Sequence, residues 1–436
     1  MKSYRVKIRI VLGILVIYFV SLVVLKAGAV DSPEKRMDGI EEAGVSFAEF
    51  QVPEDVKVVG IGEATHGNRE FQFIKMQMLQ KLVEQGSCHA IAFEMNPGEA
   101  AVYNDAICDA ESDLSALLSD TDYPLYDTEE MLALLCWMKE YNLEHPTDPL
   151  HFYGVDMQGD IKEFQYLDRF CHEYDGQFGE EELKKLEQLA ALAQAEESYD
   201  GILESRDFIE GLRDKLRTRS SSMEDDAAFR FQNAAMIANT LLQWIDAPSF
   251  DEDANAYGQY RDDRMAENLK AYYEIEAERG YPQILITAHN GHTMKGNAQG
   301  YGEYTMGNKI NELFDGSYYT VGTEFYHTCV NIHTAGTYDD AYLREDHEYT
   351  SEDMLAYQAQ FFEGGVYCLD FAKVTDSSSR IWKWLHTPHF TGCAGEGYNA
   401  YMDMYRTYRC KLVVSDHYDA MIYFYETTPI RVRSYK

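Results

Sequence analysis

The first 160 residues alternate short aliphatic runs with longer amphipathic stretches, and this alternation constrains the fold more than any other feature. Residues 56–61, 89–95 and 151–155 are aliphatic runs of the length typical of buried strands. Residues 69–85, between the first two runs, carry apolar side chains every three or four positions, which predicts an amphipathic helix. Strands and helices that alternate in this way predict βαβ units. We therefore expect an α/β fold, with a mostly parallel sheet flanked by helices.

The rest of the chain changes character twice. Residues 161–246 are highly charged and helical in periodicity, so we expect a helical insertion there. Aliphatic runs return at 283–288 and 318–325, and beyond about residue 360 strand-like runs alternate with aromatic loops. The predicted organisation is a first α/β core segment, the insertion, and a second α/β core segment with a smaller C-terminal α+β part, at residues 40–160, 161–246 and 254–436.

Residues 1–29 have the pattern of a signal peptide or a membrane anchor. Basic residues precede an uncharged, mostly aliphatic run at 10–25, and Ala27-Gly28-Ala29 has the form of a signal peptidase site. The run is short for a membrane span of about 20 residues, which favours cleavage, although an uncleaved membrane tether stays open. We expect an exported protein, either extracellular or in the cell envelope.

Charge and cysteine content narrow the range of partners. The net charge of −36 repels phosphate backbones, so nucleic acid is not an expected partner. None of the eight cysteines forms a CxxC pair, which argues against zinc-ribbon and thioredoxin-type sites. An even number of cysteines in an exported chain permits disulfides, and Cys393 with Cys410 is the favoured pair, although the connectivity stays open.

Reactive side chains collect where the expected strands end. In an open parallel sheet the carboxyl ends of the strands line one crevice, where such folds bind ligands. We therefore expect these side chains to converge, and they are Glu63 and His66 after the first strand, Glu94 at the end of the second, Asp156 at the end of the third, His289 and His292 after the fourth, and Glu324 at the end of the fifth.

The densest of these segments is residues 62–70, GEATHGNRE. His66 is a candidate general base at neutral pH, and a nearby carboxylate such as Glu63 would orient it and raise its basicity. Arg69 begins the next helix and is a candidate for stabilising a developing oxyanion. The competing interpretation is an ordinary strand–turn–helix junction with surface charges.

The later strand ends add further candidates. Glu94 lies in an aliphatic strand and must be paired if it is buried, which makes it a candidate partner for a histidine or for Arg69. His289 follows an aliphatic strand directly and adds a second candidate catalytic histidine, whereas Asn290 and His292 are candidates for binding the substrate. Asp156 is a further candidate for substrate binding, but an Asp after a strand is also a common helix N-cap.

The type of reaction follows in part by elimination. No GxSxG segment is present, so a serine nucleophile lacks support. Water activated by a base then remains as the candidate nucleophile. Ester hydrolysis with His66 as the base is the reaction that we expect. No cofactor is expected, but zinc or manganese held by the same glutamates and histidines stays an alternative, without the support of an HExxH motif.

Taken together, these segments resemble the erythromycin esterase family. GEATHGNREF after a short strand, FE at the next strand end and AHNGH after a later strand carry the resemblance. Further similar stretches follow in the same order, and the resemblance runs from about residue 40 to the end; they lie at 124–142, 151–158, 260–269, 304–310 and 417–429.

The resemblance implies an α/β core with a helical insertion, and hydrolysis of the lactone ester of macrolide antibiotics. It also implies that His66 activates water, that Glu63, Arg69, Glu94 and His289 line the site, and that Arg261 faces the cleft. The export segment, and Gly291 where alanine is more usual, depart from the family's pattern. Two alternatives stay open: a metal-dependent hydrolase, and an envelope protein that keeps the fold for binding only.

Overall fold

The computed structural model describes residues 36–121, 123–195, 199–223, 225–296, 303–334 and 343–433. The expected signal peptide or anchor at 1–29 lies outside these residues. Among the described residues, no helix is long and apolar enough to span a membrane.

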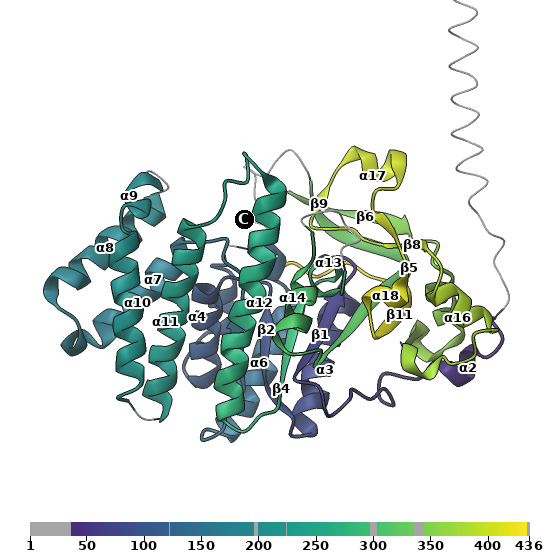
Figure 1. The fold of residues 1–436 in the computed structure, drawn as a ribbon, viewed down its shortest axis with the longest axis horizontal. Coiled ribbons are helices and arrows are strands. Elements are labelled where there is room, and N and C mark those ends of the chain that lie inside the picture. The colour runs from purple at the N-terminus through teal and green to yellow at the C-terminus, as the bar shows by residue number, and fades with distance from the viewer. Residues whose placement is uncertain are drawn as a thin grey trace, which may run out of the picture.

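A large sheet forms the centre of the molecule (Figure 1). Its first six strands run parallel and the last is antiparallel, which confirms the predicted α/β class. In spatial order they are β3 (His151–Gly154), β2 (Cys88–Phe93), β4 (Gln283–His289), β1 (Val58–Glu63), β5 (Tyr318–Thr334), β11 (Ala420–Thr427) and β7 (Val366–Asp370). Because β4 inserts between β2 and β1, strand ends that are distant in sequence become neighbours, and Glu63 lies opposite His289.

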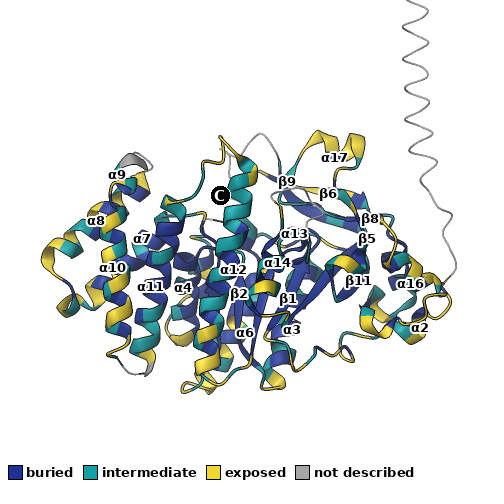
Figure 2. Ribbon diagram, viewed as in Figure 1, coloured by how far each residue is buried: buried dark blue, intermediate teal, exposed yellow. Residues whose placement is uncertain are grey.

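Helices cover both faces of this sheet, which explains why the inner strands are aliphatic on both sides (Figure 2). Val59, Ile61 and Ile91 pack in one core with α3 (Arg69–Glu84), α4 (Pro97–Cys108) and α6 (Glu129–Glu144). Val58 and Ile284 point the other way and pack with α12 (Ala254–Glu278) and α14 (Met306–Leu313). Alternate residues of each strand thus serve opposite cores.

The segment expected to be a helical insertion is helical and has a core of its own. It lies on the far side of α4 and α12 from β5 and β11 (Figure 1). Its elements are α7 (Ile161–Glu173), η2 (Asp175–Gln177), α8 (Glu180–Ala195), α9 (Tyr199–Leu203), α10 (Arg206–Ser220) and α11 (Asp225–Ile245).

The fifth strand is longer than predicted. We expected it to end at residue 325 with Glu324 as its last polar residue, but β5 continues to Thr334, so Glu324 lies within the strand. The outer half of β5 pairs with β6 (Arg344–Thr350) and β9 (Gly397–Tyr398), and it is only partly buried. Polar residues are tolerated there, and they hid the strand from a search for aliphatic runs.

Short elements complete the described part of the chain. A separate two-stranded sheet pairs β8 (His389–Gly392) with β10 (Arg409–Leu412). The remaining elements are α2 (Ile40–Ala43), α5 (Leu114–Leu118), η1 (Pro124–Tyr126), α13 (Asn290–Thr293), α15 (Met354–Gln358), η3 (Ala359–Phe361), η4 (Glu363–Gly365), η5 (Phe371–Lys373), α16 (Arg380–Leu385), α17 (Ala400–Tyr405) and α18 (Val414–His417).

Candidate active site

Glu63 and His66 form a hydrogen-bonded pair at the carboxyl end of β1. His66 Nδ1 lies 2.8 Å from Glu63 Oε1, and the side chains are 14% and 2% exposed. The turn that follows them requires glycine at position 67, because a Cβ there would lie 1.9 Å from the backbone oxygen of Asn331. The predicted base and its predicted carboxylate partner are therefore in contact, with the histidine partly accessible.

The second oxygen of Glu63 is held by two side chains of α3. Lys75 Nζ and Gln72 Nε2 each lie 2.8 Å from Glu63 Oε2, and Lys75 is almost completely buried. Burial raises the pKa of Glu63, but the charge of Lys75 and the bond to His66 more than offset this and bring it to about 2. Glu63 is thus a fixed carboxylate.

Sequence reasoning missed Lys75, although a signal was present. The buried face of α3 includes Phe71, Lys75 and Leu79, which are spaced four residues apart. A lysine in register with apolar residues is a candidate for burial, and a buried lysine requires a partner.

The pKa of His66 is raised above its usual value. Burial alone would lower it, but the hydrogen bond and charge of Glu63 raise it, and the charges of Glu94 and Glu396 add to this. Glu396 precedes β9 and forms an ion pair with Arg344, which is buried at the start of β6. Sequence reasoning did not anticipate this contribution from Glu396.

His289, the last residue of β4, lies beside His66 with ring centroids 5.1 Å apart. Burial and the neighbouring His66 charge lower the pKa of His289 to about 3, so its ring is neutral. Its Nδ1 accepts a hydrogen bond from the backbone N–H of Gly291 at 3.2 Å, which places the remaining proton on Nε2. In the part of the chain that the structure describes, Nε2 is buried without a hydrogen-bond partner.

Glu94 connects this pair to a network of charges. Its Oε2 accepts the backbone N–H of His289 at 3.0 Å, and its Oε1 lies 2.7 Å from Arg261 Nη2 and 3.2 Å from His292 Nε2. Burial raises the pKa of Glu94, but the charges of His292 and Arg261 hold it well below its usual range. Glu94 is therefore an ionised acceptor that links three of the predicted site residues.

The outer carboxylates of the network hold Arg261 and His292 in place. Asp156 contacts Arg261 through both oxygens, at 2.9 and 2.6 Å, and Asp262 Oδ1 lies 2.6 Å from His292 Nδ1. Asp156 is not a helix N-cap, because α7 begins at Ile161. Burial lowers the pKa of His292, but Glu94 and Asp262 raise it to about 10, so the ring is positively charged at neutral pH.

Two predicted site residues contact other parts of the molecule. Arg69 Nε lies 3.1 Å from Glu130 Oε1 of α6, and its guanidinium lies over the Phe73 ring. The side-chain amide of Asn290 donates to the backbone oxygen of Thr323 at 2.8 Å and accepts from its N–H at 3.3 Å. In this conformation Arg69 pairs with a neighbouring helix, and Asn290 ties α13 to β5.

The metal alternative has no preformed site in the described residues. Among them, no group of three or more His, Cys, Asp or Glu side chains is arranged to hold a metal ion.

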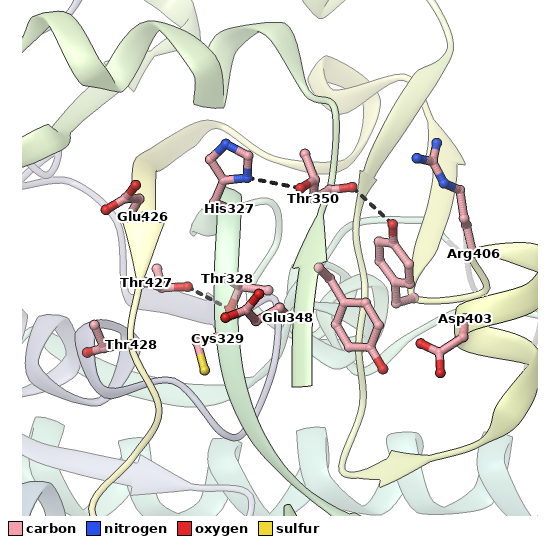
Figure 3. Close-up of a pocket in the computed structure, with 12 residues that line it drawn as sticks. His327, Thr328, Cys329, Glu348, Thr350, Asp403, Arg406, Glu426, Thr427 and Thr428 are labelled. Carbon is pink, nitrogen blue, oxygen red and sulfur yellow. Dashed lines mark hydrogen bonds between the residues drawn. The ribbon is translucent and has the colours of Figure 1, made fainter. Parts of the chain in front are cut away.

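Arg261, Asp262 and His292 of this network line a pocket of about 250 Å³ at the start of α12. A larger hollow of about 720 Å³ lies elsewhere, between β5, β6, β11 and α17 (Figure 3). His327 points into it and bonds Thr350, while Glu426 lies across from them. None of the paired histidines and carboxylates described above lines this hollow. We therefore place the candidate chemistry at the smaller pocket.

Comparison with known proteins identifies the family. The model of the erythromycin esterase family matches residues 83–427. The chain belongs to this family. A curated relative, the putative hydrolase YbfO of Bacillus subtilis, is 21% identical over 297 residues, which is 62% of this chain. The match spans 65% of that relative.

Several solved structures share the fold of this chain. A succinoglycan biosynthesis protein superposes with a TM-score of 0.66 at 16% identity, covering 91% of this chain and 97% of that chain. A protein from Bacillus cereus gives 0.63 at 18% identity, covering 87% and 91%. A variant of the erythromycin esterase EreC in its open conformation gives 0.59 at 14% identity, covering 92% and 99%. At these identities the likeness establishes the fold, and with the family match it supports a hydrolase of this family.

Proposed function

We propose that this protein hydrolyses an ester or lactone by means of a water molecule that His66 activates. The observation that carries the proposal is the pair of His66 and a buried, ionised Glu63, placed beside a neutral His289 with an unpaired Nε2. Membership of the erythromycin esterase family supports the same class of reaction.

His66 acts as the general base in this reaction. Its Nδ1–H donates to Glu63, which leaves Nε2 to take a proton from water. Lys75 and Gln72 fix the carboxylate, and Glu63 in turn fixes the tautomer and orientation of the imidazole. The positive ring that forms when His66 takes the proton is stabilised by Glu63.

His289 acts as the donor to the developing negative charge. A neutral ring that carries its proton on Nε2 donates one hydrogen bond, and its low pKa keeps it neutral across the working pH range. A buried donor without a protein partner is well suited to an oxyanion, because no existing bond has to break first. Glu94 holds the backbone of His289, and through it the ring, in place.

Macrolide lactones are the first substrates to test, because the family model and the EreC likeness point to them. The acidic chain also suits a substrate with a basic amine better than an anionic one. Other esters and lactones follow if macrolides are not hydrolysed. We also propose that the protein is exported, on the pattern of residues 1–29.

The test is hydrolysis of erythromycin, and then of p-nitrophenyl esters, by the full-length chain and by the His66→Ala variant. We expect turnover by the wild type and a loss of roughly 100-fold or more in the variant. Because His66 must be neutral to accept a proton and its pKa is raised, kcat/KM should rise with pH through that raised value and then level off. Turnover should be indifferent to a chelator.

His327→Ala is the matched control, since His327 lines the larger hollow of Figure 3. It should keep wild-type turnover. Loss of turnover in His327→Ala together with full turnover in His66→Ala would move the site to that hollow. A chelator-sensitive wild type would favour the metal-dependent alternative.

A further inference from the structure

The pocket at the start of α12 is a built cavity with two unlike sides. Its volume is about 250 Å³, below the roughly 300–1,000 Å³ that encloses a drug-sized ligand. It therefore has room for one ring-sized part of a substrate. For brevity we call it the ring pocket, and it is lined by Gln158, Phe250, Ala254, Tyr257, Gly258, Arg261, Asp262, Gly291, His292 and Thr305.

One side of the ring pocket presents aromatic rings that are held in place. Phe250 and Tyr257 meet edge to face, with centroids 5.6 Å apart, and Gln158 Nε2 donates to the Tyr257 hydroxyl at 3.3 Å. Ala254 and Gly258, which lie one helical turn apart, add no bulk that would fill the space. Phe250 is 61% exposed, which is unusual for a large apolar side chain and leaves it available for a ligand.

The opposite side of the ring pocket offers hydrogen-bond donors whose positive charges are already paired with carboxylates. The two positive groups, Arg261 and His292, are paired with three carboxylates, Glu94, Asp156 and Asp262, so a further anion gains no net attraction and a cation would compete with existing pairs. Arg261 Nη1 has no carboxylate within bonding distance among the described residues; its contact is His292 Nε2 at 3.3 Å. Since both groups are cationic at neutral pH, that contact is not a hydrogen bond, and Nη1 keeps N–H groups for a ligand.

The ring pocket adjoins the candidate catalytic pair. Glu94 contacts both Arg261 in the pocket floor and the backbone of His289, whose ring lies 5.1 Å from that of His66. Gly291, which lines the pocket, also donates its backbone N–H to His289 Nδ1 at 3.2 Å, so Gly291 and Glu94 both join the pocket to the candidate catalytic pair.

We propose that the ring pocket binds a neutral, hydroxylated ring of sugar type, so that the substrate is an acyl ester carried on a sugar. This inference rests on the proposed esterase function. One face of the ring lies on Tyr257, and its hydroxyl oxygens accept from Arg261 Nη1. In the reaction the water oxygen bonds the acyl carbon, the bond from that carbon to the sugar oxygen breaks, and His66 passes the water's proton to the sugar oxygen.

The test compares two acetyl esters that share an acyl group: monoacetylated glucose and p-nitrophenyl acetate. In Tyr257→Ala we expect kcat/KM for acetyl-glucose to fall about tenfold, mainly through KM, because an aromatic contact of this kind contributes on the order of one power of ten. The decrease in kcat/KM for p-nitrophenyl acetate in the same variant should be clearly smaller. Tyr260→Ala is the matched control on the same helix, because Tyr260 does not line the pocket and instead contacts Arg264.

Equal losses on both esters, or hydrolysis of p-nitrophenyl acetate without hydrolysis of acetyl-glucose, would overturn the sugar assignment and leave the esterase proposal standing. If neither ester is hydrolysed, the acyl-sugar substrate is overturned, the esterase proposal is decided by the erythromycin assay, and saturation-transfer NMR with methyl glucoside tests the pocket separately. Binding by the wild type that Tyr257→Ala abolishes supports the assignment. Binding of succinate without binding of methyl glucoside would assign the pocket to an anionic group instead.

Discussion

The sheet carries a buried histidine–carboxylate cluster at each end, and the two differ in how completely they are closed. At the amino end, His151 Nδ1 lies 2.7 Å from Glu276 Oε1 and 2.8 Å from the Tyr153 hydroxyl, and Arg279 Nη1 lies 2.6 Å from Glu276 Oε2. The His151 ring is stacked on Phe229 at 4.1 Å. We call this the amino-end cluster.

The carboxyl-end cluster of Glu63, His66 and His289 contains the same types of residue, including a cation, Lys75, that pairs with the carboxylate. It differs because His289 Nε2 has no partner among the described residues and a pocket adjoins it. Residue types therefore do not separate a structural cluster from a reactive one. The proposed function instead distinguishes them by position at the carboxyl ends of the strands and by an unsatisfied donor beside a cavity.

The largest expected difference is in the response to neutralising the carboxylate. Glu63→Gln removes the acceptor that orients His66, so we expect kcat/KM to fall roughly 10³–10⁴-fold. Glu63 also raises the pKa of His66, so the residual activity should reach its plateau at lower pH than in the wild type. Rate–pH profiles of the wild type and the variant measure both effects.

Glu276→Gln is the matched change at the other end. It should lower the free energy of unfolding by about 3 kcal/mol, because it disrupts a buried ion pair, yet leave kcat/KM of the folded protein nearly unchanged. A large loss of kcat/KM in Glu276→Gln at a temperature where it is folded would contradict the division into structural and reactive clusters.

The next largest effect concerns the buried cation of the carboxyl-end cluster. Lys75→Met leaves the carboxylate of Glu63 without its main opposite charge, and we expect a loss of about 3–5 kcal/mol in the free energy of unfolding. Lys81→Met, farther along the same helix, should cost much less, because Lys81 bonds backbone carbonyls near the surface. Urea denaturation of the two variants gives the comparison.

The free energy of unfolding of Lys75→Met at low pH provides a second test of whether Lys75 keeps Glu63 ionised. The pKa of Glu63 is depressed to about 2, so its contribution to stability is present above the usual glutamate pKa and is lost as pH falls toward 2. Without Lys75 the pKa of Glu63 should rise, and this loss should begin at higher pH. An unchanged acid profile would mean that Lys75 does not hold Glu63 ionised.

Much of the sheet and part of the site follow from local sequence. The order of strands and helices was readable because each inner strand is buried on both faces and is therefore aliphatic throughout. The convergence of Glu63, Glu94 and His289 follows from one topological rule, that parallel strands end at one edge. The insertion of β4 between β1 and β2, which makes them direct neighbours, was not readable from the sequence.

What the sequence did not reveal depends on packing between distant segments. Arg69 begins a helix near the site, but its side chain pairs with Glu130 of a neighbouring helix. The position of strand ends in the sequence does not predict this contact. Glu396 reaches the electrostatic environment of His66 from 330 positions farther along the chain, held by Arg344. The outer half of β5 was missed because partly buried positions and polar side chains alternate there with the buried Val330 and Ile332.

A smaller effect tests whether the carboxyl-end cluster depends on a fixed outer segment. None of the eight cysteines is in a disulfide in the structure, but Cys393, next to β8, and Cys410, in β10, are in hydrogen-bond contact, and the segment after Cys393 carries Glu396. We expect thiol–disulfide exchange with oxidised glutathione to link them, with up to about 3 kcal/mol of added stability for a loop of roughly 15 residues. Peptide mapping without reductant identifies the bond.

Cys393→Ser should remove that gain and increase hydrogen exchange in residues 393–412, while leaving the amino-end cluster unaffected. Cys108→Ser is the matched control, because Cys108 is exposed and has no cysteine partner in the described residues. Equal effects of oxidant on the wild type and on Cys393→Ser would rule out this pair as the linked one.

A last comparison separates the two ends by the direction of their pH response. His292 faces Glu94, Asp262 and Arg261, and its pKa is raised to about 10. Its contribution to stability is therefore complete below about pH 6.5. The contribution is lost as pH rises toward 10, by at most about 1.4 kcal/mol per pH unit. His89, in β2 at the amino end, has a pKa lowered by burial, so its contribution is instead lost as pH falls below 6.5. Urea midpoints measured from pH 5 to 9 should therefore flatten on the alkaline side in His292→Gln and on the acid side in His89→Gln. If His292→Gln keeps the wild-type slope above pH 7, then His292 is not held protonated by Glu94 and Asp262, and the charge balance assigned to the floor of the ring pocket is wrong.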